Sequence, residues 1–284
     1  MMYQSPQSIA EAITLLTSTE KAKILAGGTD LLVQLRNRSH LPELLVDIKQ
    51  IPETRAIQVN GEELVIGAAV TGAELNEHAA ASLWPGVAEA FDLIGSTQIQ
   101  GRASLGGNLC NASPAADSVP ALIAAGAIAR IAGPKGEREL PVEEVNMGPG
   151  KTNLQPGEFI VSFRFPVRPP HSGDAYLRFI PRTEMDIAVV GVGINLSLDD
   201  SGNCNVARVG LGAVAPTALL VEDAANALIG TPVDEAALEK LSAAVSAACK
   251  PINDKRGTIE YRTKVAGVLA KRVALIALDR ARNH

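Results

Sequence analysis

Apolar residues along the first 54 positions follow helix-like and strand-like spacings in turn. Ser8 and Glu11 form a capping-box pattern, which predicts that a helix begins there. The apolar stripe of that helix consists of Ile9, Ala12, Ile13 and Leu16. Short apolar runs predict strands over 22–26 and 43–51, with a helix over 29–38 between them. This order implies a small parallel, right-handed α/β unit.

The pattern changes between about 55 and 170, where alternating runs are separated by turn signals. Asn60-Gly61 lies between two alternating runs, which is a strong hairpin signal. We expect a helix over 86–96, a second hairpin that turns at 133–136, and a strand over 158–167. This part therefore reads as mixed helices and antiparallel strands.

Prolines and small residues over 166–174 mark a linker by composition. A long hairpin is predicted over 186–214, with its turn near 200–202. Thr231 to Asp234 predicts a helix start with Pro232 at the first helical position. Two apolar stripes at helical spacing follow: Leu238, Leu241, Val245 and Ala248, then Val265, Val268, Leu269, Val273 and Ile276. We expect three domains in series, over 1–54, 55–170 and 171–284.

Composition narrows the class of protein. The chain has 284 residues, 46% of them hydrophobic, and this is a length at which a single core tends to split into domains. The net charge of -5 and the lack of a dense Lys/Arg run argue against a nucleic-acid surface. No apolar run reaches the roughly 18 residues that a membrane helix needs.

The cysteines and the N-terminal residues indicate the cellular compartment. Cys110, Cys204 and Cys249 lack the spacing of a metal site, and an odd count suits a reducing environment. The first residues show no basic segment followed by an apolar one, so we expect no signal peptide. Together these features predict a cytoplasmic protein.

A glycine pair, Gly27-Gly28, separates the predicted strand over 22–26 from the next predicted helix. Glycine lets the backbone approach a ligand, and a helix N-terminus offers free N–H groups and partial positive charge. Both features favour a bound phosphate, whereas the alternative is a tight turn that needs only positive φ. Asp30 would repel a phosphate unless its side chain caps the helix.

A second glycine pair, Gly106-Gly107, lies beside Ser104 and Asn108 in a long stretch of small and polar residues. Such a stretch packs poorly against itself and suits a backbone wrapped around a flat, polar ligand. Two loops of this kind suggest a dinucleotide, which has two phosphates to hold. Asp117 would then suit a ribose hydroxyl or a ring nitrogen.

Gly210 to Ala215 fits the loose G-x-G-x-x-A pattern of a rival nucleotide site. However, these glycines recur with period two inside a predicted hairpin strand, and Pro216 precedes any helix, so this match is weak. The scattered histidines are assigned no catalytic role: His40, His78, His171 and His284.

The two glycine loops, in this order and separation, resemble the flavin-binding motifs of one family. This is the FAD-binding medium subunit of the xanthine dehydrogenase / carbon monoxide dehydrogenase family, the molybdenum hydroxylases. The resemblance covers nearly the whole chain, including 5–16 and 178–196. It implies an α+β architecture in which two N-terminal subdomains form an FAD-binding fold of the vanillyl-alcohol-oxidase type. A C-terminal domain with an antiparallel sheet and helices follows.

The resemblance also implies a set of FAD-binding residues. In the first loop they are Leu25, Ala26, Gly27, Gly28, Thr29, Asp30 and Leu31, and in the second they are Ser104, Leu105, Gly106, Gly107 and Asn108. Outside the loops, Asp117 matches an acidic FAD ligand, Ile94 and Ile160 or Val161 match apolar contacts, and Arg178 matches a basic residue at the flavin. The loop over 182–187 would lie near the flavin ring.

A three-part enzyme is implied as well. A large subunit with a molybdenum cofactor would oxidise the substrate, and a small subunit with two [2Fe-2S] clusters would pass electrons to FAD in this chain. From FAD they would reach NAD+, a quinone, O2 or another acceptor, in a complex expected to be a dimer of heterotrimers. The alternatives are a self-contained FAD-dependent oxidoreductase of related fold and a binding subunit that has lost FAD.

Overall fold

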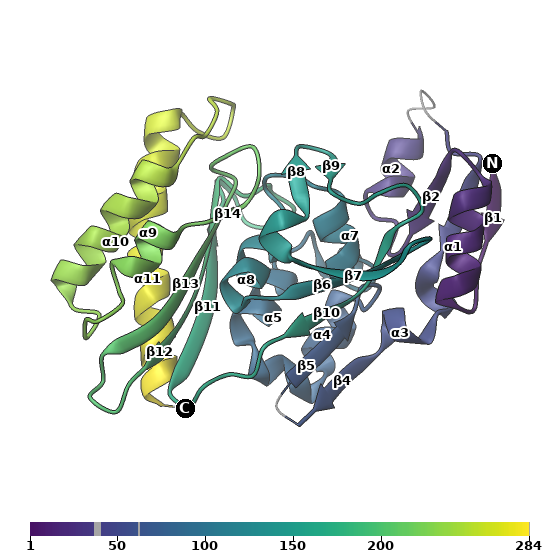
Figure 1. Cartoon of the computed structure of the whole chain (residues 1–284). Coiled ribbons are helices and arrows are strands. Elements are labelled where there is room, and N and C mark those ends of the chain that lie inside the picture. Colours follow the sequence, from purple (N-terminus) through teal and green to yellow (C-terminus); the bar gives the residue numbers. More distant parts are fainter. Residues whose placement is uncertain (37–40, 62, 284) are drawn as a thin grey trace.

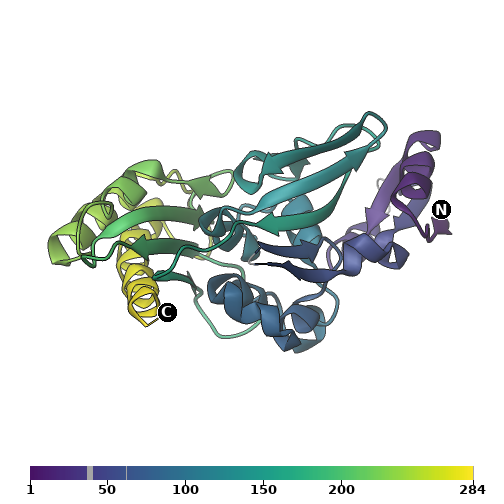
Figure 2. The same ribbon diagram turned by 60° about the horizontal axis from the view of Figure 1, so that its bottom comes forward.

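The computed structural model describes residues 1–36, 41–61 and 63–283. They form three packed units in chain order, with the N-terminal unit at one end and the two longest C-terminal helices at the other (Figure 1). Figure 2 shows the same three units from below, with the central one joining the other two. Two of the histidines discussed above, His40 and His284, lie outside the described residues.

The first unit is the expected parallel α/β unit. Its three strands are parallel and lie in the order β1-β3-β2. The Ser8 hydroxyl accepts a hydrogen bond from the Glu11 amide, as expected of an N-cap, whereas the Glu11 carboxylate reaches the Gln7 amide. The elements are β1 (Met2–Gln4), α1 (Ile9–Ser18), β2 (Ala22–Leu25), α2 (Leu31–Arg36), β3 (Leu44–Asp47), η1 (Ile48–Gln50) and α3 (Pro52–Arg55).

The second unit contains a five-stranded antiparallel sheet in the order β4-β5-β10-β6-β7. Both predicted hairpins are present, as β4-β5 and β6-β7, and the strand expected over 158–167 is β10 at the centre of the sheet. The helix expected over 86–96 ends earlier, at Asp92. The strands and the two short pieces beside them are β4 (Ile57–Asn60), β5 (Glu63–Gly67), β6 (Ile128–Gly133), β7 (Gly136–Pro141), β8 (Asn146–Gly148), β9 (Lys151–Thr152) and β10 (Phe159–Phe165). The helices are α4 (Gly72–Glu77), η2 (Ala79–Leu83), α5 (Pro85–Asp92), α6 (Thr97–Gln100), α7 (Leu105–Cys110), α8 (Ser118–Ala125) and η3 (Val142–Glu144).

The third unit has a four-stranded antiparallel sheet in the order β11-β12-β13-β14, with helices on one face. The predicted long hairpin is β12-β13, but β11 was not predicted and replaces the end of the expected linker. The prediction that Pro232 opens a helix is wrong, because the helix begins after Asp234, whose side chain accepts from the Ala237 amide. The elements are β11 (Ser172–Phe179), β12 (Val190–Leu198), β13 (Cys204–Gly212), β14 (Leu219–Leu220), α9 (Glu222–Asn226), α10 (Glu235–Ala248) and α11 (Ile259–Arg282).

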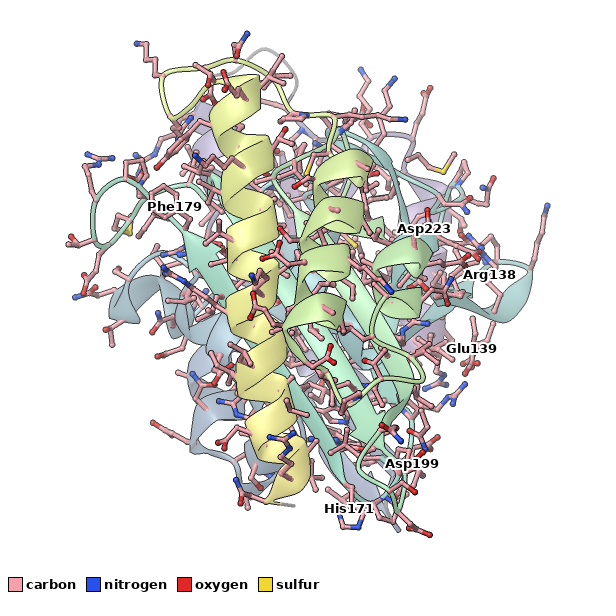
Figure 3. All side chains as sticks on the ribbon, turned by 90° about the vertical axis from the view of Figure 1, so that its left-hand side faces the viewer. Arg138, Glu139, His171, Phe179, Asp199 and Asp223 are labelled. Carbon is pink, nitrogen blue, oxygen red and sulfur yellow. The ribbon has the colours of Figure 1, made fainter. Side chains whose placement is uncertain are left out.

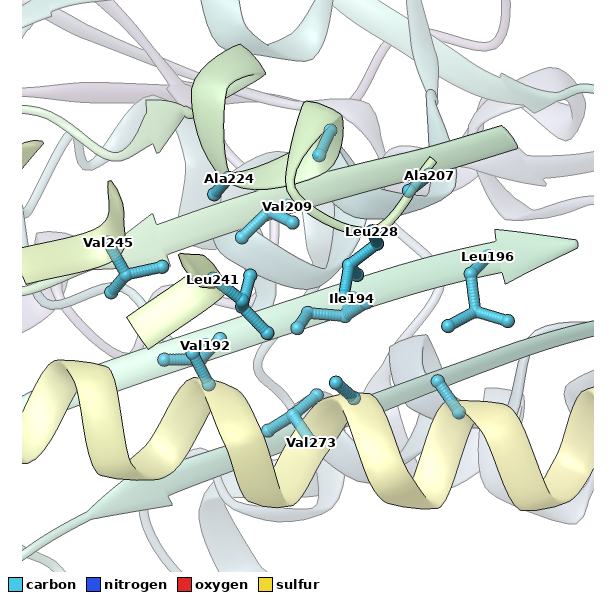
Figure 4. Close-up of a cluster of buried hydrophobic side chains, with 14 of the residues drawn as sticks. Val192, Ile194, Leu196, Ala207, Val209, Ala224, Leu228, Leu241, Val245 and Val273 are labelled. Carbon is cyan, nitrogen blue, oxygen red and sulfur yellow. The ribbon is translucent and has the colours of Figure 1, made fainter. Parts of the chain in front are cut away.

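The helices of the third unit cover one face of its sheet (Figure 3). Alternate residues of β12 and β13 point toward α10 and α11, where Val192, Ile194 and Val209 meet Leu241 and Val273 (Figure 4). The buried residues of α11 are largely small and include Ala266, Ala270, Ala274, Ala277 and Ala281, while Gly267 faces Ser242 and Ser246 of α10. The expectation that Val268 belongs to the buried side of α11 is wrong, since it is 47% exposed.

The opposite face of the same sheet packs on α8 of the second unit. Ideal Cβ atoms built on Gly193 and Gly210 would lie 2.7 and 2.2 Å from the Pro120 carbonyl oxygen, and one on Gly212 would lie 2.6 Å from Pro120 Cγ. Only glycine allows so close an approach. The G-x-G pattern at 210–212 is therefore explained by packing of a helix on a strand, as its period of two indicated.

Polar residues join the second and third units around this contact. Asp174 on β11 is buried, accepts from the Gly86 amide at 2.7 Å and pairs with Arg168 at 3.1 Å. Burial raises the pKa of Asp174 to about 6, although Arg168 opposes the shift. Arg208 on β13 donates to the Ile123 carbonyl at the end of α8 and so caps that helix. The two units therefore form one joined body.

Candidate functional site

A cavity of about 310 Å³ lies between the first and second units, where both glycine loops meet. Most of the residues predicted from the family resemblance line it: Ala26, Gly27, Gly28, Thr29, Asp30, Leu31, Ile94, Ser104, Gly106, Gly107, Asn108 and Ile160. The side chains of Leu105 and Val161 are instead buried in the cores on either side, and Leu25 lies beside the cavity without lining it. Folding thus brings together two glycine pairs that lie 79 positions apart in the sequence, from 27 to 106.

The first loop connects β2 to α2 and leaves several backbone donors free. Among the described residues, none accepts a hydrogen bond from the amide N–H of Gly27, Gly28, Thr29 or Asp30. Gly28 has φ +79, a conformation that favours glycine. An ideal Cβ on Gly27 would lie 1.9 Å from the Arg102 carbonyl oxygen, so this glycine lets the two units touch. The loop therefore presents unpaired N–H groups at a helix start, which is an arrangement that binds anions.

The side chain of Asp30 does not cap α2, although a cap was expected to keep its charge away from a bound phosphate. No described residue donates a hydrogen bond to the Asp30 carboxylate, and the residue is exposed at the edge of the cavity. Desolvation at the cavity edge raises the pKa of the Asp30 carboxyl, and no hydrogen bond from a described residue opposes this shift. Because the Asp30 carboxylate would repel an anion, the glycine side of the loop is the side suited to one.

The second loop begins α7, and its two glycines have different surroundings. The Gly106 amide donates to the Ala68 carbonyl at 2.9 Å, and an ideal Cβ on Gly106 would lie 2.7 Å from that same oxygen. The Gly107 amide donates to the N-cap hydroxyl of Ser104 at 3.2 Å. Gly106 thus serves the packing of α7 on the second unit, whereas Gly107 faces the cavity.

Asn108 on α7 and Asn111 at its C-cap tie the site to its neighbours. Asn108 accepts at Oδ1 from the Ser118 hydroxyl at 2.6 Å and from the Ser118 amide at 3.2 Å, which holds the start of α8 against α7. Asn111 accepts from Gln34 Nε2 at 3.1 Å, across the cavity from α2. These bonds fix both walls relative to each other.

Two predicted ligands, Asp117 and Arg178, do not line the cavity. Arg178 Nη1 donates to Asp117 Oδ2 at 2.8 Å, and the Tyr176 hydroxyl donates to Asp117 Oδ1 at 3.1 Å. Burial raises the pKa of Asp117 to about 6, and the Arg178 charge and these hydrogen bonds oppose the shift. The cluster joins the start of α8 to β11, so it supports the site from the side of the third unit.

Several cavity residues were not predicted from the sequence. Some adjoin the two loops in sequence and others come from distant elements: Lys23, Ile24, Gln34, Ile48, Ala68, Ala103, Cys110, Asn111, Leu154, Glu158 and Phe159. Glu158 is held by two hydrogen bonds from Arg138, both at 2.8 Å, so its charge is already paired. Burial raises the pKa of the Cys110 thiol to about 12, which keeps it protonated and fits a filler role.

A second cavity of about 300 Å³ lies between the second and third units. Its walls are mostly apolar and include Pro114, Pro149 and Ile187, with Lys250 and Arg256 beside them. The loop over 182–187, predicted to lie near the flavin ring, therefore borders this cavity rather than the first one. The segment 111–115 contributes to both cavities and separates them.

Comparison with known proteins agrees with this architecture. The family described as "FAD binding domain in molybdopterin dehydrogenase" matches residues 1–168, and the "CO dehydrogenase flavoprotein C-terminal domain" matches residues 175–277. The carbon monoxide dehydrogenase medium chain of Afipia carboxidovorans is 37% identical over 284 residues, covering 99% of this chain and 98% of that protein. The chain belongs to the FAD-binding medium subunits of the molybdenum hydroxylase family.

Other medium subunits are similar over nearly their whole length. The xanthine dehydrogenase FAD-binding subunit of Escherichia coli O157:H7 is 33% identical over 274 residues, covering 95% of this chain and 94% of that one. The crystal structure of the cyanide-inactivated Cu,Mo-CO dehydrogenase matches with a TM-score of 0.93 at 36% identity, and covers 99% of this chain and 98% of that one. Quinoline 2-oxidoreductase from Pseudomonas putida 86 matches with a TM-score of 0.90 at 28% identity and the same coverage. The α+β architecture, the FAD-binding domain and the C-terminal domain of this medium subunit are thus confirmed.

In the described part of the chain, no group of three or more His, Cys, Asp or Glu side chains is placed to hold a metal ion. Across residues 1–36, 41–61 and 63–283, no helix combines the length and the apolar character needed to cross a membrane.

Proposed function

We propose that this chain is the electron-transfer subunit of a heterotrimeric molybdenum hydroxylase. In this role it takes electrons from [2Fe-2S] clusters of a small partner subunit and passes them through FAD to an external acceptor. A large partner subunit holds the molybdenum cofactor and oxidises the substrate. The observation that carries the proposal is the cavity with unpaired loop N–H groups, in a chain matched along its length by FAD-binding medium subunits.

The residues of the cavity fit FAD. The unpaired N–H groups of Gly27 and Gly28 and the bare backbone of Gly107 are suited to the two phosphates, and a side chain at Gly107 would narrow this part of the cavity. Apolar side chains, including Ile48 and Ile160, are suited to the faces of flat rings. We propose that the predicted residues that line the cavity bind FAD. We also propose that Asp117 and Arg178 do not touch FAD and support its site by holding the start of α8 in place.

When bound, FAD supplies a redox centre that takes up electrons singly and gives them up as a pair. The side chains of the cavity bind and orient this group and shield it from water. Of the two carboxylates that line the cavity, Glu158 is paired with Arg138, and Asp30 stands at the exposed edge. Among the described residues, neither carboxylate is thus free inside the cavity to act as acid or base on a substrate, which favours the electron-transfer role over a self-contained oxidoreductase.

One edge of the molecule is suited to a partner subunit. Figure 1 shows α2, β8 and the connection from α10 to α11 along the same upper edge. Large apolar side chains on β8, the β11–β12 loop and that connection are exposed: Met147 by 67%, Met185 by 60%, Ile187 by 50% and Ile252 by 69%. We propose that the iron–sulfur subunit docks here, since Ile187 and Ile252 also line the second cavity, close to the FAD site.

The remaining features of the complex are also proposals. We propose three domains over 1–54, 55–170 and 171–284, and assembly as a dimer of heterotrimers. The three free cysteines suit a cytoplasmic location. The acceptor is NAD+, a quinone, O2 or another carrier, and the substrate is set by the large subunit.

A visible absorption spectrum of the chain, purified with the subunits that accompany it, tests the proposal. We expect a flavin spectrum, iron–sulfur absorbance from the partner, and one FAD per chain released on denaturation. An intact complex without flavin would overturn the proposal. Substrate oxidation by the purified chain without partners would instead favour the self-contained oxidoreductase.

The docking edge has a test of its own with a matched control. Ile252→Asp puts a charge on the edge, whereas Val206→Asp puts one on β13, where Val206 is also exposed. We expect Ile252→Asp to weaken recovery of the iron–sulfur subunit and Val206→Asp to leave it unchanged. Equal recovery with both variants contradicts docking at this edge.

A further inference from the structure

The first glycine loop is held from behind by a lysine that does not line the cavity. Lys49 donates from Nζ to the Ala26 carbonyl at 2.8 Å and to Asp47 Oδ1 at 2.6 Å. The other carboxylate oxygen of Asp47 accepts from the Tyr3 hydroxyl at 2.6 Å. The side chains of Lys49 and Asp47 are only 18% and 8% exposed, so this bonded chain is largely shielded from water.

The direction of one amide follows from the bond between Lys49 and Ala26. The Ala26 carbonyl and the Gly27 N–H belong to the same planar trans peptide group, in which they point in opposite directions. An ammonium that fixes the carbonyl therefore turns the Gly27 N–H away from Lys49. Ala26 and Gly27 line the cavity and Lys49 does not, and no described residue accepts from the Gly27 N–H. The geometry thus leaves this donor for a ligand.

Contact with the second unit limits the loop from another side. The Arg102 carbonyl oxygen lies where a Cβ of Gly27 would be, at 1.9 Å from that ideal position. The peptide between Ala26 and Gly27 is therefore held at its carbonyl by a charge and at its Cα by packing. A positive charge bonded to the carbonyl also polarises the peptide, which strengthens its N–H as a donor.

We propose that Lys49 is a positioning residue for FAD, and that it directs and strengthens the Gly27 N–H as a donor to the dinucleotide. Asp47 and Tyr3 keep the ammonium in place, so the N-terminal strand β1 takes part in holding the cofactor site. This inference rests on the proposed FAD site. A merely structural role for the same residues would stabilise the first unit without changing FAD affinity.

The test compares FAD affinity with stability in the full chain, purified with the subunits that accompany it. Lys49→Met keeps the length of the side chain but removes the donor, and Lys49→Arg restores a charged donor. After removal of FAD, the dissociation constant is measured by flavin fluorescence, and the Tm of the FAD-free protein by thermal unfolding. We expect Lys49→Met to weaken FAD binding by roughly 10- to 100-fold, as loss of a charged hydrogen bond does, and Lys49→Arg to recover most of it.

A matched control and a milder variant separate the possible outcomes. Lys271→Met removes a lysine that bonds Glu235 and Glu239 far from the cavity, and it should leave FAD affinity unchanged. If Lys49→Met does not fold, Tyr3→Phe takes its place, with an expected loss of about 3-fold. Unchanged FAD affinity with a lowered Tm overturns the positioning role and leaves the FAD proposal intact. A wild-type chain that takes up no FAD overturns both.

Discussion

Gly106 and Gly107 are neighbours in α7, yet alanine at each position should affect different properties. At Gly106 the added methyl would lie 2.7 Å from the Ala68 carbonyl oxygen and 2.8 Å from Ala68 Cβ, well inside van der Waals contact. At Gly107 the one described atom within 4 Å is Ser104 Oγ, at 3.0 Å. The backbone of Ala68 therefore leaves no room for a side chain at Gly106, whereas a side chain at Gly107 would extend into the cavity.

The expected magnitudes follow from these distances. Overpacking at Gly106 costs about 1–3 kcal/mol, of which the better helix propensity of alanine offsets up to about 1 kcal/mol. The clash at Gly106 is with backbone, so the cost lies at the upper end of this range, about 2 kcal/mol net. With an unfolding entropy of about 2.1 cal/mol/K per residue, or roughly 0.6 kcal/mol/K for 284 residues, this lowers the Tm by roughly 3 °C. For Gly107→Ala, the propensity gain and the disturbed Ser104 cap are each about 1 kcal/mol and nearly cancel.

Gly107→Ala, in contrast, should weaken FAD binding while leaving the Tm nearly unchanged. A methyl on Gly107 occupies the space where the backbone would meet the dinucleotide, so we expect at least about a 10-fold rise in the dissociation constant, equal to about 1.4 kcal/mol. The assay is fluorescence titration of the FAD-free protein, together with its thermal unfolding. Wild-type affinity in Gly107→Ala would refute the ligand reading and leave the glycine pair as a structural turn. An unchanged Tm in Gly106→Ala would refute the packing argument.

Three further predictions concern the joined second and third units. The pKa of Asp174 is about 6 in the folded state and lower in the unfolded state. Between these two values the folded protein binds a proton that the unfolded chain does not, so the free energy of unfolding falls as the pH rises from about 4 to about 6. Asp174→Asn should flatten the Tm against pH in that window, and an unaltered slope would contradict the assignment. Gly210→Ala puts a Cβ 2.2 Å from the Pro120 carbonyl oxygen and should lower the Tm by several degrees in thermal unfolding. An unchanged Tm would show that α8 can move away from the sheet. Thr71→Ala removes the hydroxyl of the capping box that Glu74 completes, and should lower the free energy of unfolding in denaturant by about 1 kcal/mol. An unchanged free energy of unfolding would mean that another group caps α4.

The elements that could be predicted are those with local signals. The hairpin β12-β13 alternates in hydrophobicity and carries its own turn, and the parallel unit follows from short apolar runs around a helix. In contrast, β11 contains Asp174, Tyr176 and Arg178, whose polar groups are buried against partners in the second unit. Because those partners lie far away in the sequence, the strand resembled a polar linker. Likewise, β1 is three residues long and fully exposed, so no burial pattern marks it.

The site was predictable where the backbone itself forms it. Bare glycines next to helix starts indicate a phosphate-binding loop without knowledge of distant contacts. By comparison, Asp117 and Arg178 form an ion pair with each other, and Lys49, just after β3, reaches the Ala26 carbonyl at the end of the neighbouring strand β2. Such pairings depend on tertiary structure, so sequence alone did not distinguish a residue that touches the ligand from one that holds the loop.

The contact of Pro120 with three glycines of the neighbouring sheet limits how this chain can recombine with its relatives. The two matched family regions end and begin at residues 168 and 175, and a crossover between them would look natural in an alignment. However, the glycines at 193, 210 and 212 have to meet a helix that lies before the crossover. A hybrid that joins the first region of one subunit to the second region of another will therefore fold only if its donor sheet keeps glycine at these positions. Helix α8 and the sheet of the third unit must therefore be exchanged together, although they belong to different matched family regions.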